Sequence, residues 1–125
     1  MRKEIVFSLV ASVITLARCD TPVQYEFAAE NSTGRDIILS FSTPQIRKAV
    51  TIHAHQSALL TMTTEITKTR DDYFKDGLHV FDAIEVTQDG IPSRRRIGER
   101  RFWKLTWIKA DQGVYTVNVD PTFFD

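Results

Sequence analysis

Apolar and polar residues alternate with a period of two along much of the chain. In residues 36–42, Ile37, Leu39 and Phe41 occupy one face, while two serines lie at alternate positions on the other. Because successive side chains of a strand point to opposite faces of a sheet, this pattern predicts a half-buried β-strand.

The same alternation recurs in four later segments. They place on one face Ala58, Leu60 and Met62; Ile84 and Val86; Trp103, Leu105 and Trp107; and Tyr115, Val117 and Val119. Turn-forming sequences such as Asp89-Gly90 separate these segments, and residues 67–78 form a polar connection. The pattern predicts an all-β fold: a single immunoglobulin-like antiparallel β-sandwich of about 7–8 strands, with a barrel as the alternative.

The one long apolar run lies near the amino terminus and ends shortly before the only cysteine. Arg2 and Lys3 precede it, and it extends over residues 5–17. A helix that crosses the hydrocarbon core needs roughly 20 apolar residues, so we do not expect a permanent membrane span here. The order of basic residues, apolar run and small residues is typical of an export signal.

The residues around Cys19 predict how this signal is processed. Leu16-Ala17-Arg18-Cys19 resembles the Leu-Ala-Gly-Cys motif at which bacterial lipoproteins are acylated and cut, although Arg18 replaces the usual small residue. Cleavage after Ala17, which would release a soluble protein, and an uncleaved segment are the alternatives. Lipidation would also consume the single thiol, which has no intrachain partner. We therefore expect a signal peptide at 1–18, a short tether at 19–24 and the domain at 25–125.

The charge balance limits the partners of the domain. The 16 basic and 16 acidic residues give a formal net charge of zero at pH 7. Nucleic-acid binding draws most of its affinity from neutralising phosphates, so we expect no nucleic-acid partner.

Three segments together resemble a known family. They are the Asn/Thr turn and strand at 31–37, the strand at 81–86 that leads to Asp89-Gly90, and the strand at 114–119 followed by Phe124-Asp125. With Cys19, the chain resembles the small uncharacterised lipoproteins common in Bacteroidetes. The resemblance implies an envelope lipoprotein with an immunoglobulin-like domain and no catalytic residues to transfer.

Histidines are the candidate metal ligands. His53 and His55 are two residues apart, so on a strand both imidazoles would point the same way, and His79 could act as a third ligand. No carboxylate lies beside the pair in the sequence. Exposed histidines at a strand end are the favoured interpretation, and we expect no metal or other cofactor.

An arginine-rich segment has the most unusual local composition. It contains Arg94, Arg95, Arg96, Arg100 and Arg101. If a hairpin turned at Gly98, these side chains would form a positive patch suited to an anionic partner. The alternative is a solvated edge hairpin whose charges prevent pairing with other edges.

These observations favour a non-enzymatic module over an enzyme. No nucleophile motif surrounds a serine, and Cys19, the expected anchor, sits too near the membrane end to be a catalytic thiol. We expect a binding or structural module held at the membrane by a lipid anchor, facing the periplasm or the cell surface, with an envelope protein or a glycan as partner. A small metal-dependent enzyme that uses the histidines is the alternative.

Overall fold

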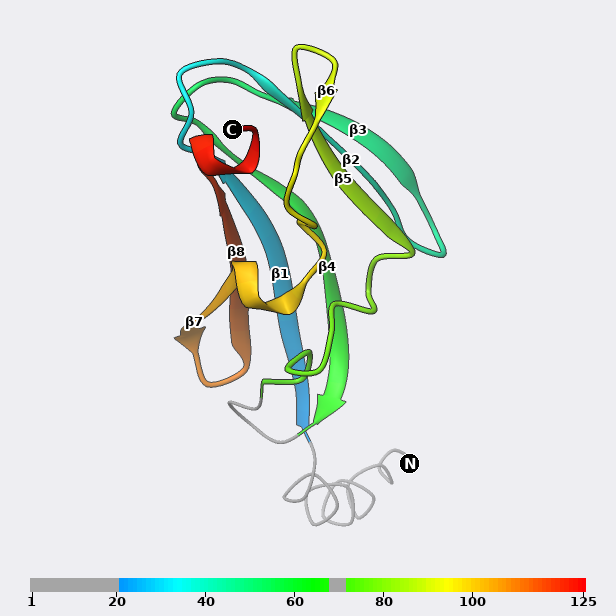
Figure 1. Cartoon of the computed structure of the whole chain (residues 1–125). Helices are drawn as coiled ribbons and strands as arrows, with labels where there is room; N and C mark the ends of the chain where they lie inside the picture. Colours follow the sequence, from blue (N-terminus) through cyan, green and yellow to red (C-terminus); the bar gives the residue numbers. More distant parts are fainter. Residues whose placement is uncertain (1–20, 68–71) are drawn as a thin grey trace, which may run out of the picture.

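The computed structural model describes residues 21–67 and 72–125, which form two packed four-stranded β-sheets (Figure 1). The first sheet has the order β4 (Ser57–Thr67), β1 (Thr21–Asn31), β8 (Gln112–Val119), β7 (Trp103–Lys109). The second has the order β3 (Arg47–Ile52), β2 (Ile37–Ser42), β5 (Ala83–Gln88), β6 (Ile91–Pro92). The predicted all-β sandwich is confirmed, and the immunoglobulin-like class is confirmed at this two-sheet level.

Strand pairing is antiparallel except between β1 and β8. These two strands run parallel, from Gln24 opposite Gln112 to Asn31 opposite Val119. The first and last strands of the chain thus lie side by side in the middle of the first sheet. Their inner faces are fully buried, as Val23 and Val117 show with exposures of 0%.

Aromatic side chains form the centre of the sandwich. Phe27 on β1 stacks on Tyr115 of β8, with 5.2 Å between ring centroids and 8° between ring planes. Phe27 also makes edge contacts with Phe74, Phe81 and Trp103, at centroid distances of 5.3, 5.4 and 6.1 Å. Such edge-to-face contacts add to the gain from burying the rings.

The structure corrects the expected boundary between tether and domain. β1 begins at Thr21, and Val23 is fully buried between the sheets. Residues 21–24 therefore belong to the sandwich, because their register continues the alternation through Tyr25 and Phe27. The expected signal at 1–18 and the first two residues of the expected tether lie outside the described residues.

A bulge in β4 corrects a second prediction. The register against β1 steps from Thr61 to Leu59 and skips Leu60. One extra residue moves the side chains that follow it to the opposite face. Leu60 is therefore buried while Met62 is 51% exposed, and the prediction that Ala58, Leu60 and Met62 share a face is wrong.

Four connections carry the chain between the sheets. They are residues 32–36, residues 53–56, the connection from β4 to β5, of which residues 72–82 are described, and residues 93–102, which include the short 3-10 helix η1 (Arg100–Phe102). A second 3-10 helix, η2 (Pro121–Phe123), lies at the carboxyl end of the described chain. Figure 1 shows η2 at the opposite end of the sandwich from the start of β1.

Candidate binding cleft

The arginine-rich segment crosses from one sheet to the other. β6 ends at Pro92 in the second sheet, and β7 begins at Trp103 in the first. Ile97 is 2% exposed, and its carbonyl oxygen accepts a 2.7 Å hydrogen bond from the indole nitrogen of Trp103. Because Ile97 is buried, the segment packs against the sandwich where it passes from the second sheet to the first. The hairpin predicted to turn at Gly98 is therefore wrong.

Arg100 belongs to a largely buried polar cluster. One of its terminal nitrogens lies 2.8 Å from Asp72 Oδ2, and its guanidinium lies 5.0 Å from the ring centre of Tyr115. The Tyr115 hydroxyl donates a 2.5 Å hydrogen bond to Asp72 Oδ1 and accepts one from the Phe74 amide at 3.2 Å. Burial, followed by the bond to Asp72, raises the pKa of Tyr115 well above its usual range. Tyr115 thus remains a donor that ties the 72–82 segment to β8.

Arg94 and Arg95 hold the carboxyl-terminal turn. Arg94 donates to the backbone carbonyl oxygen of Asp125, and Arg95 Nε donates to that of Thr122 at 3.3 Å. The Arg95 guanidinium also lies 6.0 Å from the ring centre of Phe123. Both arginines contact carbonyl dipoles, so neither positive charge meets a carboxylate side chain among the described residues.

Arg101 and Arg96 differ in their partners. Arg101 Nε lies 2.7 Å from Glu99 Oε1, and its guanidinium lies 4.4 Å from the ring centre of Phe102. Arg96 is exposed, and its guanidinium makes no hydrogen bond or ion pair with the part of the chain that the structure describes. The five arginines therefore do not form one patch. Among the described residues, Arg94, Arg95 and Arg96 form no ion pair with a carboxylate side chain.

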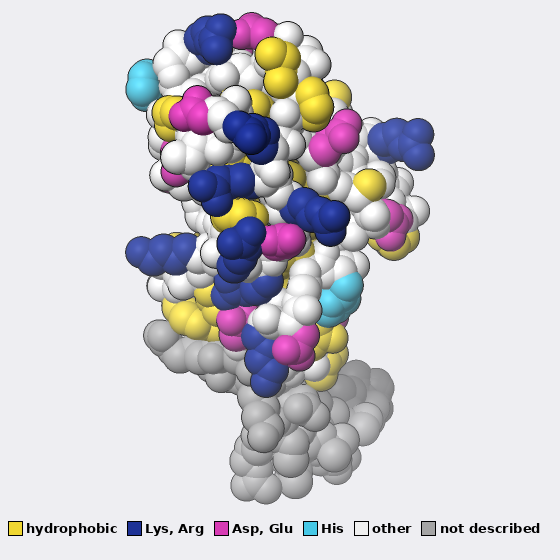
Figure 2. Space-filling model, viewed as in Figure 1, with side chains coloured by type: hydrophobic (Ala, Val, Ile, Leu, Met, Phe, Trp, Pro, Cys, Tyr) yellow, Lys and Arg dark blue, Asp and Glu magenta, His cyan; other side chains and the backbone are white. Residues whose placement is uncertain are grey.

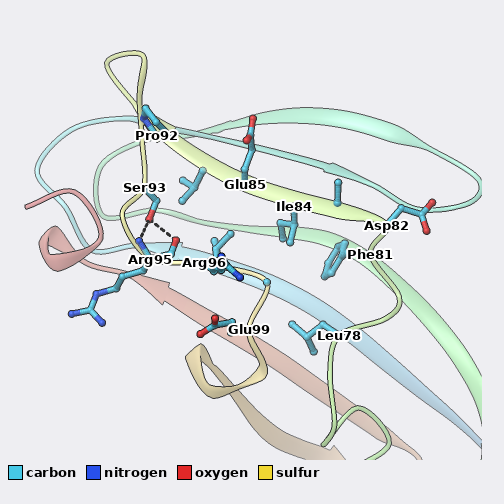
Figure 3. Close-up of a pocket in the computed structure, with 14 residues that line it drawn as sticks. Leu78, Phe81, Asp82, Ile84, Glu85, Pro92, Ser93, Arg95, Arg96 and Glu99 are labelled. Atoms are coloured by element: carbon cyan, nitrogen blue, oxygen red, sulfur yellow. Dashed lines mark hydrogen bonds between the residues drawn. The ribbon is translucent and has the colours of Figure 1, made fainter.

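A cleft of about 460 Å³ separates this segment from β5. One wall includes Ser93, Arg95 and Arg96, and the other includes Ile84 and Glu85 (Figure 3). The remaining lining residues are Leu78, Phe81, Asp82, Ala83, Val86, Pro92, Ile97, Gly98 and Glu99. The cleft thus combines an apolar floor with charged side chains at its rim.

The cleft follows an open edge of β5. β6 pairs only with Thr87 and Gln88, and the Ser93 amide donates to the Val86 carbonyl at 2.9 Å. Backbone groups of alternate strand residues point to the same edge, so the N–H and C=O of Ile84 point toward the cleft. The cleft therefore offers main-chain hydrogen-bonding groups as well as side chains.

Both walls of the cleft include charged residues. The segment with Arg95 and Arg96 also contributes Glu99, and Glu85 and Asp82 border the cleft on the other side with side chains that point away from the arginines in Figure 3. In Figure 2, basic side chains run down the face of the molecule that carries η1, with acidic side chains among them. This face suits a partner with carboxylates on one side better than a uniformly anionic polymer.

Comparisons with protein families, with curated proteins and with solved structures find no match to this chain. The site must therefore be interpreted from its own geometry.

The structure does not bring the three histidines together as a metal site. His53 Nδ1 lies 3.1 Å from Asp36 Oδ2 in the turn after β3, and His55 in the same turn has a φ of 62°. His79 instead packs on Phe74, with 4.9 Å between ring centroids. Across residues 21–67 and 72–125, no three His, Cys, Asp or Glu side chains are grouped to hold a metal ion.

Cys19, the predicted lipidation site, lies outside the described residues. Within residues 21–67 and 72–125, the structure contains no helix with the length and hydropathy needed to cross a membrane.

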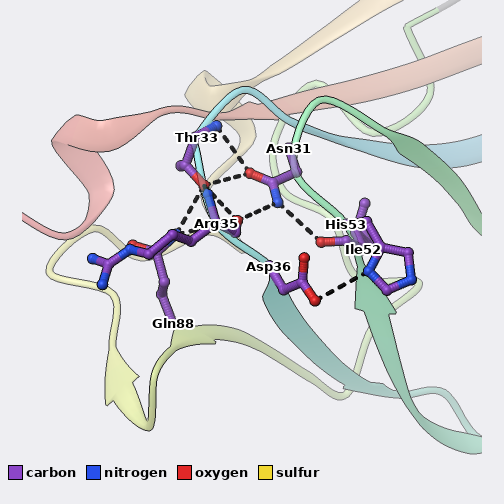
Figure 4. Close-up of polar contacts among 7 residues, drawn as sticks. All are labelled: Asn31, Thr33, Arg35, Asp36, Ile52, His53 and Gln88. Atoms are coloured by element: carbon purple, nitrogen blue, oxygen red, sulfur yellow. Dashed lines mark hydrogen bonds and ion pairs between the residues drawn. The ribbon is translucent and has the colours of Figure 1, made fainter.

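A buried polar network lies where β1 leads into β2 (Figure 4). The Asn31 side-chain oxygen accepts from the Thr33 amide at 2.9 Å and from the Thr33 hydroxyl at 2.7 Å. Asn31 Nδ2 donates to the carbonyls of Arg35 and Ile52 at 2.8 and 2.9 Å. Gln88 of β5 donates to the Thr33 hydroxyl at 2.8 Å. The network joins both sheets at this corner.

Sequence reasoning identified the Asn31 turn but not its partners across the sandwich. The turn Asn31-Ser32-Thr33 was predicted from residue type, and the structure confirms it as an Asx-type turn. Gln88 carries no local sequence signal, because its burial depends on the pairing of β5 with β2. One sequence feature indicates the open edge of β5: Pro92, which ends β6 after two residues.

Proposed function

We propose that the protein is a non-enzymatic binding module of the cell envelope that holds an extended, carboxylate-bearing segment of a partner protein. The observation that carries this proposal is the cleft between β5 and residues 93–99. Its edge offers the backbone of Ile84, and its opposite wall offers the unpaired charge of Arg96. An extended peptide can add a strand to such an edge, while side-chain contacts supply specificity.

The backbone groups of β5 favour a protein partner over a glycan. Strand addition satisfies the N–H and C=O of Ile84 together, whereas a sugar chain has no matching repeat of donors and acceptors. Guanidinium groups pair well with carboxylates, which explains why acidic side chains fit the arginine wall.

We also propose that the module is exported as a lipoprotein anchored at Cys19, like the small Bacteroidetes lipoproteins that the sequence resembles. Only Asp20 separates Cys19 from the first residue of β1. One residue spans at most about 3.6 Å, so acylation would hold the sandwich close to the membrane surface. A partner would then be met in the periplasm or at the cell surface.

An acidic peptide titration tests the binding cleft. We expect an extended peptide of alternating Thr and Glu to shift the backbone amide signal of Ile84 in NMR spectra. Arg96→Glu should weaken this binding about tenfold or more, because a charge-assisted hydrogen bond is replaced by repulsion.

The control is Arg47→Glu, an equal charge change on the exposed edge strand β3. It should leave the peptide affinity within about twofold, since surface charges contribute little at a distance in salt. The proposal fails if the Ile84 signal does not move, or if both variants weaken binding equally.

A further inference from the structure

Apart from the stretch of β5 beside the cleft, three of the four sheet edges carry features that discourage pairing with another chain. Charged side chains, proline, bulges and very short strands are the usual protections. The protected edges are β3 with Arg47 and Lys48, β6 with two residues and Pro92, and β7 with Lys104, Lys109 and a bulge after Trp107.

The fourth edge, β4, lacks these protections over most of its length. It is eleven residues long, and Glu65 is its single charged residue. Leu59, Met62 and Ile66 project from its outer face with exposures of 53%, 51% and 66%. Its bulge at Leu60 leaves residues 61–67 in regular register with β1.

The free side of β4 carries no neighbouring strand in the described structure. Within the described residues β4 pairs with β1 alone, and no backbone hydrogen bond from outside that pair reaches residues 57–66. A crevice of about 230 Å³ lies beside this edge. It is lined by Thr61, Met62, Thr63 and Glu65 of β4, by residues 43–45, and by Phe74, His79 and Val80. A long edge with a single charged residue and a partly apolar outer face is therefore available for pairing.

We infer that β4 pairs with β4 of a second copy of this chain, antiparallel and centred on Thr64. In this register Met62 lies opposite Ile66 of the second copy, Ile66 lies opposite its Met62, and the two Thr64 side chains face each other. Apolar pairs and Thr–Thr pairs directly opposite stabilise antiparallel strands.

The sequence of β4 favours a second copy over a different partner. Glu65 lies directly opposite Thr63 in this register, and the two Glu65 side chains are diagonal neighbours at about 7–8 Å, so no like charges are directly opposite. A two-fold axis repeats each favourable pair, as in most homodimers. The outer face of β4 carries no charged residue that could give specificity for a strand of a different protein.

The proposed pairing also limits the assembly to two copies. It joins two first sheets through β4, so each end of the combined sheet is a β7 strand. Lys104 and Lys109 lie on both of these ends. The arrangement is therefore a closed dimer, and it does not depend on the peptide cleft at β5.

Disulfide trapping tests the register in the full chain carrying Cys19→Ala, so that the native cysteine cannot link two copies. Thr64→Cys should form about tenfold more covalent dimer than Thr106→Cys, because directly opposite Cβ atoms lie about 4.5–5.5 Å apart. Thr106 is an equally exposed control on the outer face of β7. Equal trapping of the two variants would overturn the inference.

Light scattering and sedimentation of the Cys19→Ala chain give an independent test. We expect a dimer whose dissociation constant rises about tenfold or more in Met62→Lys, because both Met–Ile pairs are lost. Ile108→Lys, at an exposed site on β7, should leave it unchanged. A monomer at every concentration up to about 0.1 mM, or species that grow beyond two copies, would overturn the inference. Peptide binding at β5 is measured separately, so either proposal can fail alone.

Discussion

Phe27→Ala is expected to lower the free energy of unfolding by about 3–5 kcal/mol, the range for a buried phenylalanine. Phe27 is fully buried on the central strand β1 and contacts four aromatic rings. A domain of this size has a total stability of about 5–15 kcal/mol, so the change removes much of it. Urea denaturation followed by tryptophan fluorescence measures the loss.

The matched control is Ile91→Ala at the exposed tip of β6, where the side chain is 60% exposed. It should change stability by no more than about 0.5 kcal/mol. Phe27→Leu keeps most of the apolar volume and should lose about 1–2 kcal/mol, which provides a measurable variant if the alanine chain does not fold. A loss below about 1 kcal/mol in Phe27→Ala would contradict the described packing.

Asn31→Ala should cost about 2–4 kcal/mol, since each buried polar group left without a partner costs about 1–3 kcal/mol. The substitution removes the acceptor of Thr33 and the donor to the Arg35 and Ile52 carbonyls. Gln88 still contacts the Thr33 hydroxyl, so part of the network remains. The same urea denaturation gives the value.

Ser32→Ala serves as the control in the same turn. The Ser32 hydroxyl bonds only to the exposed Asn118 side chain, so its loss should cost about 0.5 kcal/mol or less. Asn31→Asp keeps the acceptor but places a carboxylate oxygen against the Arg35 and Ile52 carbonyls, so its stability should be no higher than that of Asn31→Ala. Equal stability of the Asn31→Ala and Ser32→Ala chains would show that the corner network does not hold the sheets together.

The sequence predicted the class of fold because period-two alternation is a local property. Ile37, Leu39 and Phe41 are buried as expected, and Asp89-Gly90 makes the expected tight turn with positive φ at both residues. β1 shows the same alternation at Val23, Tyr25, Phe27 and Ala29, all of which are buried. This local pattern predicts a strand from Val23 onward and conflicts with the expected tether at 19–24.

Other features could not be predicted from local pattern. The bulge at Leu60 appears only when β4 pairs with β1, and it decides which face Met62 occupies. The arginine segment depended on distant partners: Arg100 pairs with Asp72, and Arg94 with the carbonyl of Asp125. A run of like charges predicts a patch only where no such partner intervenes. Arg96 has no such partner among the described residues, and its predicted anionic-partner role remains a proposal.

Anchoring of the module at the membrane is tested most directly by the intact mass and detergent partitioning of the full chain expressed in a bacterial host, beside Cys19→Ala. Acylation of Cys19 should add lipid mass to the wild type alone and move it into the detergent phase. Each buried methylene contributes about 0.8 kcal/mol, and two or more acyl chains anchor stably. If both chains stay in the aqueous phase and begin at Arg18, cleavage follows Ala17 and the lipid-anchored account is contradicted.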